Sequence, residues 1–365
     1  MSEIEHYDTN SNRKVKVLFI GLDVSGGGAE RVFINIANSL DVKMLDIRIV
    51  YNCSFEESDI RKDVPVTYYG ETHMRKGLKK LYNEIKRFKP DYIFTTNGTI
   101  AWTLPILCKL SGVRAKVVTR VAVTPCEKYY TSWKSRFQEY FSSKQYKKMH
   151  LVVAQTEYMR QDLIKSYNIP SEKVKVIRNY IDFARVQRLS VNETRPIELR
   201  NDGYNIVAVG ALYSVKGFDL LIEALAKLKN VIPDARLYIL GEERYEIGYK
   251  AFLSKKASDL GITDRVFLCG YKSNPYPYYA NADLFVLSSR KEGFPNVVLE
   301  SLSLHTPVVC TNCVDFSGIF DESQGIVVNK EDSASLAEGI KKAHESLKKP
   351  IPFKYSNFDY NTLFI

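Results

Sequence analysis

Two glutamates eight residues apart, in Glu292-Gly-Phe-Pro-Asn-Val-Val-Leu-Glu300, form the pattern with the clearest chemical meaning in this sequence. Pro295 and Asn296 favour a helix start, so we expect Glu292 in a loop and Glu300 about one turn inside the helix. A helix N-terminus attracts anions, and carboxylates accept hydrogen bonds from hydroxyls. The segment therefore suits a nucleotide sugar, with one glutamate on the transferred sugar and the other on the ribose. In the plainer alternative, Glu292 is a solvated charge in a loop and Glu300 pairs with a neighbouring basic group.

Two further loops follow expected strands and could hold phosphate. Gly26-Gly27-Gly28 precedes an amphipathic helix, and glycines there let the backbone approach a ligand. Arg31 stands where a third glycine of G-x-G-x-x-G would be, which disfavours a nicotinamide dinucleotide. Lys216 stands in the second loop, where its ammonium could reach a phosphate. Alternatively, neither loop binds a ligand: the glycines form only a tight turn, and Lys216 is a solvated side chain.

Short apolar runs alternate with helical patterns along the chain, which predicts an α/β fold with parallel sheets. The 365 residues suggest two such domains, with a substrate site between them. Residues 184–204 are polar and aperiodic, and we interpret them as a linker. The expected strands are 15–22, 46–51, 91–96, 115–121, 151–155 and 174–178 in the first half, and 205–211, 235–241, 266–270, 284–288 and 307–311 in the second.

The formal charge of +10 lies entirely in the first half of the chain. Residues 1–182 carry the excess, and residues 73–150 alone carry +13. Two segments, 75–89 and 129–148, are expected to be helices that combine cations with aromatic residues, as peripheral membrane helices do. The alternatives are ordinary core-facing stripes and a nucleic-acid surface, but a basic patch without a nucleic-acid motif is weak support for the latter.

No apolar run reaches the length of a membrane span, and the first residues lack a signal-peptide core, so we expect a cytoplasmic protein. The six cysteines are scattered, as reduced core thiols are. Cys310-Thr-Asn-Cys313 is formally C-x-x-C but has no second pair for zinc. We find no histidine array and no D-x-D pair, and we expect no metal.

The motifs together resemble the retaining glycosyltransferases of family 4, including bacterial polysaccharide and lipid-linked glycan transferases. The segments that carry the resemblance are GGGAER, GALYSVKG, EGFPNVVLE followed by SLSLHTPVV, AQTEYMRQDLIKSYNIPSEKVKVIRNYID and YYANADLFVLSSRKEGFPN. The resemblance implies the GT-B fold, with two Rossmann-like parallel-sheet domains facing across a cleft. Residues 1–184 would be the acceptor and membrane-side domain, and 185–365 the donor domain. The last segment, about 350–365, is a candidate to pack back on the first domain.

The resemblance also implies roles for particular residues. Glu292 would contact the donor sugar, Glu300 the ribose and Lys216 the diphosphate. The Gly26, Gly27, Gly28 turn and the backbone of Phe294, Pro295, Asn296 and Val297 would flank the phosphates, with Tyr271 and Lys272 near the base. The implied reaction moves a hexose-type sugar with retention and without metal. No protein nucleophile is evident, so we expect front-side attack, with Lys216 stabilising the leaving group.

Four positions depart from the family pattern. Ala211 stands where a phosphate-binding arginine is frequent, and Arg290 or Arg120 is a candidate to replace it. Val118-Thr119-Arg120 lacks the usual histidine. Phe316-Ser317-Gly318-Ile319-Phe320 replaces a Gly-Pro-x-Glu turn, and His305 replaces a glycine. We therefore assign no catalytic histidine.

The basic first half and the resemblance together suggest a lipid-linked acceptor, such as a saccharide on a polyprenyl diphosphate, reached at the inner face of the cell membrane. The alternatives are a nucleotide-sugar 2-epimerase on the same architecture and a nucleic-acid-binding protein. We expect no nucleic-acid partner, because that reading leaves Glu292 and Glu300 without a purpose.

Overall fold

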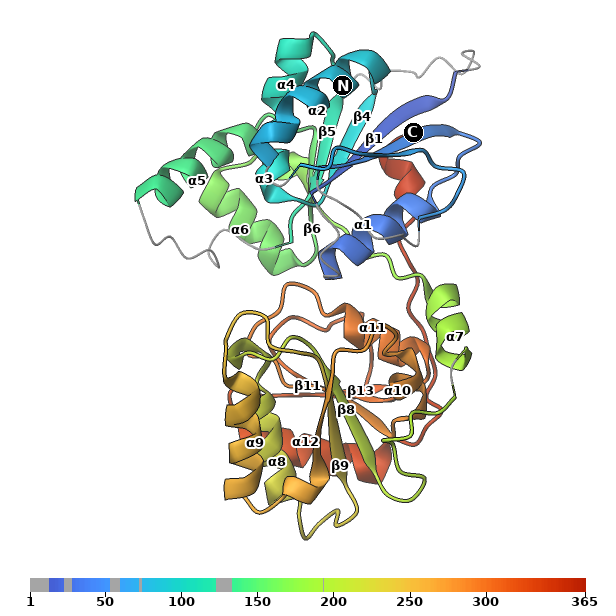
Figure 1. The fold of residues 1–365 in the computed structure, drawn as a ribbon, viewed down its shortest axis with the longest axis vertical. Coiled ribbons are helices and arrows are strands. Elements are labelled where there is room, and N and C mark those ends of the chain that lie inside the picture. The colour runs from blue at the N-terminus through green and yellow to red at the C-terminus, as the bar shows by residue number, and fades with distance from the viewer. Residues whose placement is uncertain (1–12, 23–27, 53–59, 72–73, 123–132, 193) are drawn as a thin grey trace. The chain divides into compact units, whose positions relative to one another are not determined.

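A computed structural model describes residues 13–22, 28–52, 60–71, 74–122, 133–192 and 194–365 of the chain. The chain forms two compact units (Figure 1). Unit 1 comprises Met1–Tyr180 and Phe358–Ile365, and unit 2 comprises Ile181–Asn357. The last residues of the chain thus belong with the first unit.

Unit 1 is built on a seven-stranded sheet in the order β3-β2-β1-β4-β5-β6-β7. All its strand pairs are parallel, as in β1 against β2 and β4. Its strands are β1 Val15–Gly21, β2 Leu45–Tyr51, β3 Val66–Tyr68, β4 Tyr92–Thr95, β5 Lys116–Arg120, β6 Leu151–Ala154 and β7 Val174–Val176. The central strands are almost fully buried because helices pack on both faces of the sheet.

Each face of the first sheet has its own apolar core. The helices are α1 Gly28–Ser39, α2 Met74–Phe88, α3 Gly98–Ala101, α4 Leu104–Ser111, α5 Trp133–Tyr146 and α6 Glu157–Tyr167. Helix α1 covers one face together with the chain end, where Phe364 packs against Phe19, Tyr92 and Phe94. Residues from α2, α3, α4 and α6 cover the other face.

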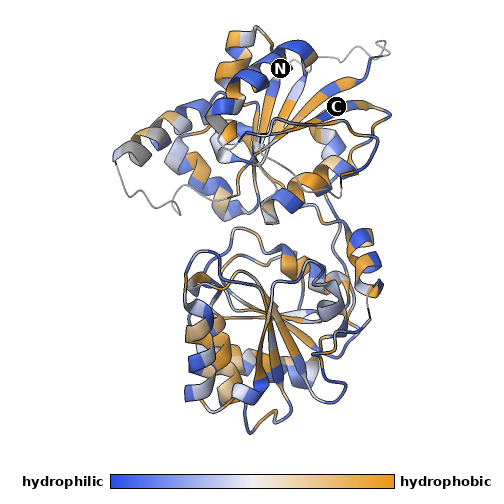
Figure 2. Cartoon of the chain, in the orientation of Figure 1, coloured by the Kyte–Doolittle hydropathy of each residue, from blue (hydrophilic) through white to orange (hydrophobic). Residues whose placement is uncertain are grey.

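Unit 2 repeats the arrangement with a six-stranded parallel sheet in the order β10-β9-β8-β11-β12-β13. Its strands are β8 Asn205–Val209, β9 Arg236–Leu240, β10 Val266–Gly270, β11 Leu284–Leu287, β12 Val308–Thr311 and β13 Gly325–Val328. Its helices are α7 Phe183–Val191, α8 Phe218–Lys227, α9 Tyr249–Asp259, α10 Tyr276–Asn281, α11 Asn296–Ser303 and α12 Ser333–Ser346. Helices α8, α9 and α12 cover one face, and α7, α10 and α11 the other. The hydropathy colouring shows apolar residues along the strands of both sheets (Figure 2).

The parallel α/β architecture predicted from the sequence is confirmed, with two differences in detail. Strands β3 and β13 were not expected, because VTY is a short edge strand and GIVV follows a polar turn. Residues 184–204 are not simply a linker. Most of α7 lies there, and its buried Val186 joins a core of unit 2, so tertiary packing fixes a segment without a clear period.

Candidate functional site

Lys216 lies in the loop that follows β8 and ends a short 3-10 turn, Ser214–Lys216. Gly217 follows as the N-cap residue of α8, with φ 63°, in the left-handed region. A Cβ at Gly217 would lie 2.1 Å from the Ser288 carbonyl oxygen, so only glycine fits this close approach. The Lys-Gly sequence thus brings the loop after β8 against the end of β11.

Glu292 lies in the loop after β11, and its carboxylate meets Lys216. The distance from Lys216 Nζ to Glu292 Oε1 is 2.6 Å, and both side chains are largely shielded from solvent. The Ser289 hydroxyl donates to the same carboxylate oxygen at 2.7 Å, and the Ser288 hydroxyl donates to the Lys216 carbonyl at 2.9 Å. The two residues predicted to be catalytic are therefore in direct contact.

The ion pair between Lys216 and Glu292 lies where the strand order of the second sheet reverses. Strands β8 and β11 are neighbours, and the order of the sheet reverses between them. In open parallel sheets, ligands bind at the carboxyl ends of strands at this kind of reversal. Lys216 and Glu292 follow the two strands that flank it, so they stand where a ligand is expected.

The pKa of Lys216 is raised on balance. Burial is the largest single effect and lowers it, but the charge of Glu292, the hydrogen bond to Glu292 and smaller effects of Tyr213 and Cys313 together raise it. Burial, followed by the Glu292 charge, raises the pKa of the nearby Cys313 thiol to about 11. Cys313 is therefore a neutral thiol at neutral pH and a poor nucleophile.

Arg290 is held within the protein by Asp219. Its guanidinium makes a two-pronged contact with that carboxylate at 2.8 and 2.7 Å, and Tyr249 donates to the same carboxylate at 3.0 Å. The Arg290 backbone N–H also donates to the Val215 carbonyl at 2.8 Å. Arg290 thus fastens the loop after β11 to the loop after β8, and a phosphate contact by Arg290 stays a prediction.

The residues after Glu292 form the start of α11, as the sequence indicated. Phe294 is buried in the core, Pro295 precedes the helix, and the Val298 N–H donates to the Pro295 carbonyl at 3.1 Å. Asn296 and Val297 are half-buried in the first turn. Glu300 lies in the second turn, also half-buried, and its charge helps to raise the pKa of Tyr279 after the larger effect of burial.

Tyr271 and Lys272 follow β10, at the edge of the second sheet. Tyr271 is exposed, and its place near the base stays a prediction. Lys272 pairs with Glu198 at 3.0 Å and lies over the Tyr278 ring, 5.4 Å from its centroid. These contacts raise the pKa of Lys272, with Tyr278 and then Glu198 as the main causes.

Arg120 and Gly28 belong to unit 1, and Gly26 and Gly27 lie outside the described residues. Gly28 is the first residue of α1. Arg120 ends β5 and is only 2% exposed; its Nε donates to Asn179 Oδ1 at 2.9 Å. Burial lowers the pKa of Arg120 to about 10. Arg120 is thus a buried group that contacts Asn179, and a phosphate contact by Arg120 stays a prediction.

The sequence did not single out several residues that complete these surroundings. Ser288 and Ser289 position Lys216 and Glu292, and Asp219 holds Arg290. Two serines directly after an apolar strand could have indicated Ser288 and Ser289, because hydroxyls at a strand end can form hydrogen bonds with neighbouring loops. Asp219 could not be recognised, since its partner is 71 residues away in the chain.

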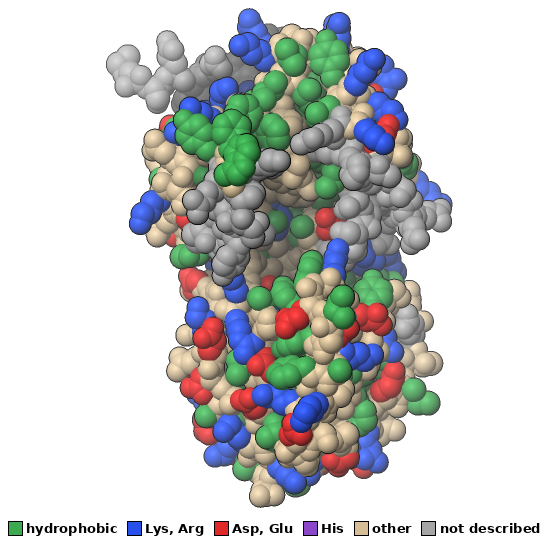
Figure 3. Space-filling model, turned by 60° about the vertical axis from the view of Figure 1, so that its left-hand side comes forward, with side chains coloured by type: hydrophobic (Ala, Val, Ile, Leu, Met, Phe, Trp, Pro, Cys, Tyr) green, Lys and Arg blue, Asp and Glu red, His purple; other side chains and the backbone are tan. Residues whose placement is uncertain are grey.

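The predicted basic segments of unit 1 are both helical in their described parts, as α2 and α5. In α2 the apolar stripe is core, with Leu81, Ile85 and Phe88 buried. In α5, by contrast, Trp133 is 73%, Phe137 64% and Tyr140 59% exposed. Hydrophobic side chains gather beside basic ones on this side of unit 1 (Figure 3).

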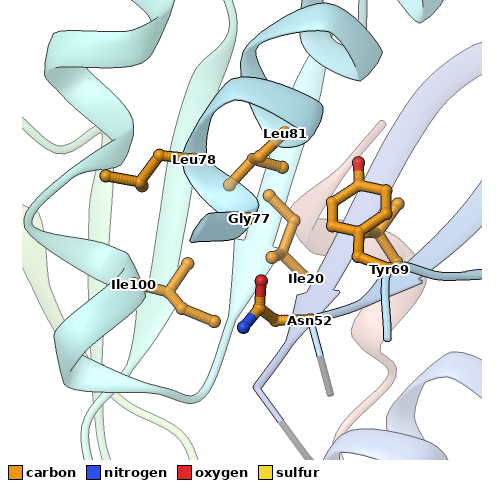
Figure 4. Close-up of a pocket in the computed structure, with 8 residues that line it drawn as sticks. Ile20, Asn52, Tyr69, Gly77, Leu78, Leu81 and Ile100 are labelled. Atoms are coloured by element: carbon orange, nitrogen blue, oxygen red, sulfur yellow. The ribbon is translucent and has the colours of Figure 1, made fainter. Parts of the chain in front are cut away.

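A small pocket lies between α2 and the sheet (Figure 4). Its volume is about 10 Å³, which admits no more than a water molecule. Asn52 points toward Gly77 of α2 at its wall, and a Cβ on Gly77 would lie 1.7 Å from Asn52 Oδ1. This pocket is a packing defect and not a substrate site.

The described part of the chain contains no group of three or more His, Cys, Asp or Glu side chains arranged to hold a metal ion. Nor does any of its helices combine the length and apolar character needed to cross a bilayer.

Two family descriptions match nearly the whole chain. "Glycosyltransferase Family 4" matches residues 26–185, and "Glycosyl transferases group 1" matches residues 191–356. Among solved structures, Anabaena HepE in complex with UDP superposes with a TM-score of 0.73 at 19% identity, covering 91% of this chain and 90% of HepE. A glycosyltransferase of Rickettsia africae gives a TM-score of 0.72 at 20% identity, covering 91% and 88%. These two likenesses show a GT-B fold.

Curated relatives agree with this assignment. An uncharacterized glycosyltransferase of Methanocaldococcus jannaschii is 28% identical over 65% of this chain and 59% of its own length. The N-acetylgalactosamine-N,N'-diacetylbacillosaminyl-diphospho-undecaprenol 4-alpha-N-acetylgalactosaminyltransferase of Campylobacter jejuni is 28% identical over 87% of each chain. This chain belongs to the family 4-like GT-B glycosyltransferases.

Proposed function

We propose that this protein moves a sugar from a nucleoside-diphosphate sugar to a lipid-linked glycan, with retention at the anomeric carbon, at the cytoplasmic face of the membrane. The observation that carries the donor half of the proposal is the 2.6 Å contact between Lys216 and Glu292 at the reversal of the second sheet. The acceptor half is supported by the name of the Campylobacter relative, which specifies a diphospho-undecaprenol acceptor. The HepE structure with UDP supports a nucleotide donor.

The ion pair suggests how the donor is held. Lys216 and Ser289 both contact Glu292 Oε1, so the carboxylate is fixed before the donor arrives. A donor diphosphate would draw the Lys216 ammonium to its own oxygens, and a sugar hydroxyl would donate to Glu292 in its place. Binding thus exchanges one charge-assisted contact for two contacts with substrate.

The chemical step then needs no protein nucleophile. The bond between the anomeric carbon and the phosphate oxygen breaks, and the acceptor oxygen bonds to the same face of that carbon. The acceptor hydroxyl proton passes to the departing phosphate oxygen. Lys216 stabilises the negative charge on the leaving diphosphate, which is where charge develops in the transition state.

A thermal-shift screen with UDP-, GDP- and ADP-sugars tests the donor site. We expect one donor class to raise the melting temperature of the wild type but not of Lys216→Met or Glu292→Gln. Lys255→Met is the matched control, because Lys255 and Asp259 form an exposed pair at the same 2.6 Å distance away from the site. The site would be refuted if no donor class raised the melting temperature of the wild type. It would also be refuted if the melting temperature of Lys255→Met rose as little with the donor as that of Lys216→Met.

Proton NMR of the product tests retention. The anomeric coupling of the transferred sugar should match that of the donor, and an inverted coupling would exclude the front-side step. Release of nucleoside diphosphate without any acceptor, together with a 2-epimeric sugar, would instead identify an epimerase.

The membrane half of the proposal rests on α5. Trp133, Phe137 and Tyr140 are exposed, and the Lys144 ammonium lies 4.4 Å from the centre of the Tyr140 ring. Exposed aromatic residues next to cations suit the boundary between lipid headgroups and acyl chains. Helix α2 contributes further exposed cations, including Lys79 and Lys86.

The chain has only two tryptophans, which makes this testable. In a Trp102→Phe variant, Trp133 is the only tryptophan, and we expect its emission to shift to shorter wavelength with anionic vesicles and less with neutral ones. An unchanged Trp133 spectrum with both would contradict membrane docking through α5. Equal, weak responses to both would contradict its electrostatic part.

A further inference from the structure

Three loops of unit 2 meet at one carboxylate, that of Asp219. The loops follow β9, β8 and β11, which are neighbours in the second sheet. Asp219 lies in the first turn of α8, after β8. It accepts hydrogen bonds from Tyr249, which starts α9 after β9, and from Arg290, which lies after β11. One side chain of the middle loop thus joins the loops on both sides of it.

The hydrogen bonds to Asp219 fix the orientation of the Arg290 side chain. Its Nη1 and Nη2 donate to the two carboxylate oxygens at 2.8 and 2.7 Å, and the Tyr249 hydroxyl donates to Oδ1 at 3.0 Å. Two parallel bonds hold the plane of the guanidinium as well as its position. Burial raises the pKa of Asp219, but hydrogen bonds from Arg290, Tyr249 and the backbone, with the Arg290 charge, lower it on balance. Asp219 is therefore a carboxylate at neutral pH.

The loop after β11 holds the turn that carries Lys216 at three successive carbonyls. The Arg290 guanidinium donates to the Ser214 carbonyl, and the Arg290 backbone N–H donates to the Val215 carbonyl at 2.8 Å. The Ser288 hydroxyl donates to the carbonyl of Lys216 itself at 2.9 Å. These bonds fix the backbone of the turn, and the direction of the Lys216 side chain depends on that backbone. Arg290 supplies two of the three.

We infer that Arg290, held by Asp219, positions Lys216 toward the leaving diphosphate and does not bind the phosphate itself. The Asp219 side chain is only 16% exposed, so Arg290 could turn to a phosphate only by leaving a poorly solvated carboxylate behind. Lys216 differs, because a sugar hydroxyl replaces it at Glu292 when the donor binds. The inference rests on the proposed function, since it assumes a nucleotide-sugar donor at Lys216. Tyr249 is a positioning residue too, because it orients Asp219.

Asp219→Asn distinguishes the two roles of Arg290, because an amide cannot hold the guanidinium with two oxygens. We expect this variant to have a kcat about 10- to 100-fold below the wild type, since a displaced Lys216 stabilises the leaving group poorly. Its affinity for the nucleoside diphosphate should not increase. Transfer to a bacterial lipid extract at saturating donor measures kcat, and calorimetric titration with UDP, GDP and ADP measures affinity. A freed Arg290 that binds phosphate would increase the affinity, so either tighter binding or an unchanged kcat would overturn the inference.

Arg290→Lys and Arg290→Gln test whether geometry or charge matters at this position. Lysine keeps a cation that could bind phosphate but lacks the two-pronged guanidinium. We expect both variants to lose kcat about 10- to 100-fold and to agree with each other within about threefold. Recovery of most of the wild-type kcat in Arg290→Lys would indicate a phosphate contact and overturn the inference.

Two further variants control for folding. Glu223→Gln removes a pair with Lys256 that also joins α8 to α9, at 2.5 Å and one turn after Asp219, and it should leave kcat unchanged. Equal losses of kcat in Glu223→Gln and Asp219→Asn would reduce the effect to general stability and overturn the inference. Tyr249→Phe removes one hydroxyl from Asp219 and should lower kcat about threefold. If Asp219→Asn does not fold, Tyr249→Phe decides, and an unchanged kcat overturns the inference.

The wild type separates the two possible failures. If it binds none of the three nucleotides and transfers no sugar, the proposed function fails and the inference fails with it. If it binds a nucleotide and transfers sugar, but Asp219→Asn binds that nucleotide more tightly or Arg290→Lys keeps the wild-type kcat, only the inference fails.

Discussion

Helices α2 and α5 have similar compositions but use them in different ways. Both mix aromatic or aliphatic residues with lysine and arginine, and the sequence predicted a membrane role for each. In α2 the apolar residues at positions 81, 85 and 88 face the sheet, and the cations are left outside. In α5 the aromatic residues at 133, 137 and 140 face solvent.

The difference shows what helical spacing can reveal. A regular apolar stripe, as in α2, indicates packing against the protein. Aromatic residues distributed around a helix, as in α5, leave some side chains exposed to solvent, and these are the ones available for a lipid surface. The net charge of a segment does not distinguish a helix that packs like α2 from one that is exposed like α5.

The largest expected difference concerns stability. Phe88→Ala in α2 should lower the free energy of unfolding by about 3–5 kcal/mol, because a buried ring leaves a cavity. Phe137→Ala in α5 should change it by no more than about 0.5 kcal/mol. Urea unfolding of both variants is the measurement, and similar losses would remove the distinction between the helices.

Membrane binding should show the opposite pattern. Phe137→Ser should lower the partition into anionic vesicles by about 10- to 100-fold, the effect of losing one buried aromatic side chain. Vesicle sedimentation measures it, with Tyr158→Ser on α6 as the control, since Tyr158 is about as exposed as Phe137. A similar loss for both variants would show that exposure alone, and not α5, determines binding.

The packing of α2 can be tested by adding atoms as well as by removing them. Gly77→Ala should destabilise the protein by about 1–3 kcal/mol although alanine favours helices, since its Cβ would meet the Asn52 side chain. Lys79→Ala on the exposed side of α2 is the control. Stabilisation by Gly77→Ala would mean that Asn52 moves aside at little cost.

The smallest effect is expected from the α2 cations. Lys79→Gln and Lys86→Gln should each weaken anionic-vesicle binding about fivefold, the contribution of one charge near the surface. Raising the salt concentration should reduce this difference between wild type and variants. If neither substitution matters at low salt, α2 faces away from the membrane and α5 acts without it.

The sequence predicted the fold class because buried parallel strands are continuous apolar runs, as LFVL of β11 is. It did not predict β3 or α7, which depend on neighbours distant in the chain. The sequence assigned Lys216 and Glu292 to one donor site, but it did not predict their direct contact, because the strand order that brings the two loops together comes from the structure. The Arg290–Asp219 pair could not be predicted, because tertiary packing alone brings its two residues together.

The central claim is sugar transfer from a nucleotide donor, held by Lys216 and Glu292, to a lipid-linked glycan. The most direct measurement is mass spectrometry of a bacterial lipid extract incubated with the protein and the nucleotide sugar found by thermal shift. The account predicts a lipid-linked glycan one sugar heavier, formed with equimolar nucleoside diphosphate by the wild type and by Lys255→Met but not by Lys216→Met or Glu292→Gln. Nucleoside diphosphate release without a heavier lipid, or equal product from all four proteins, would contradict it.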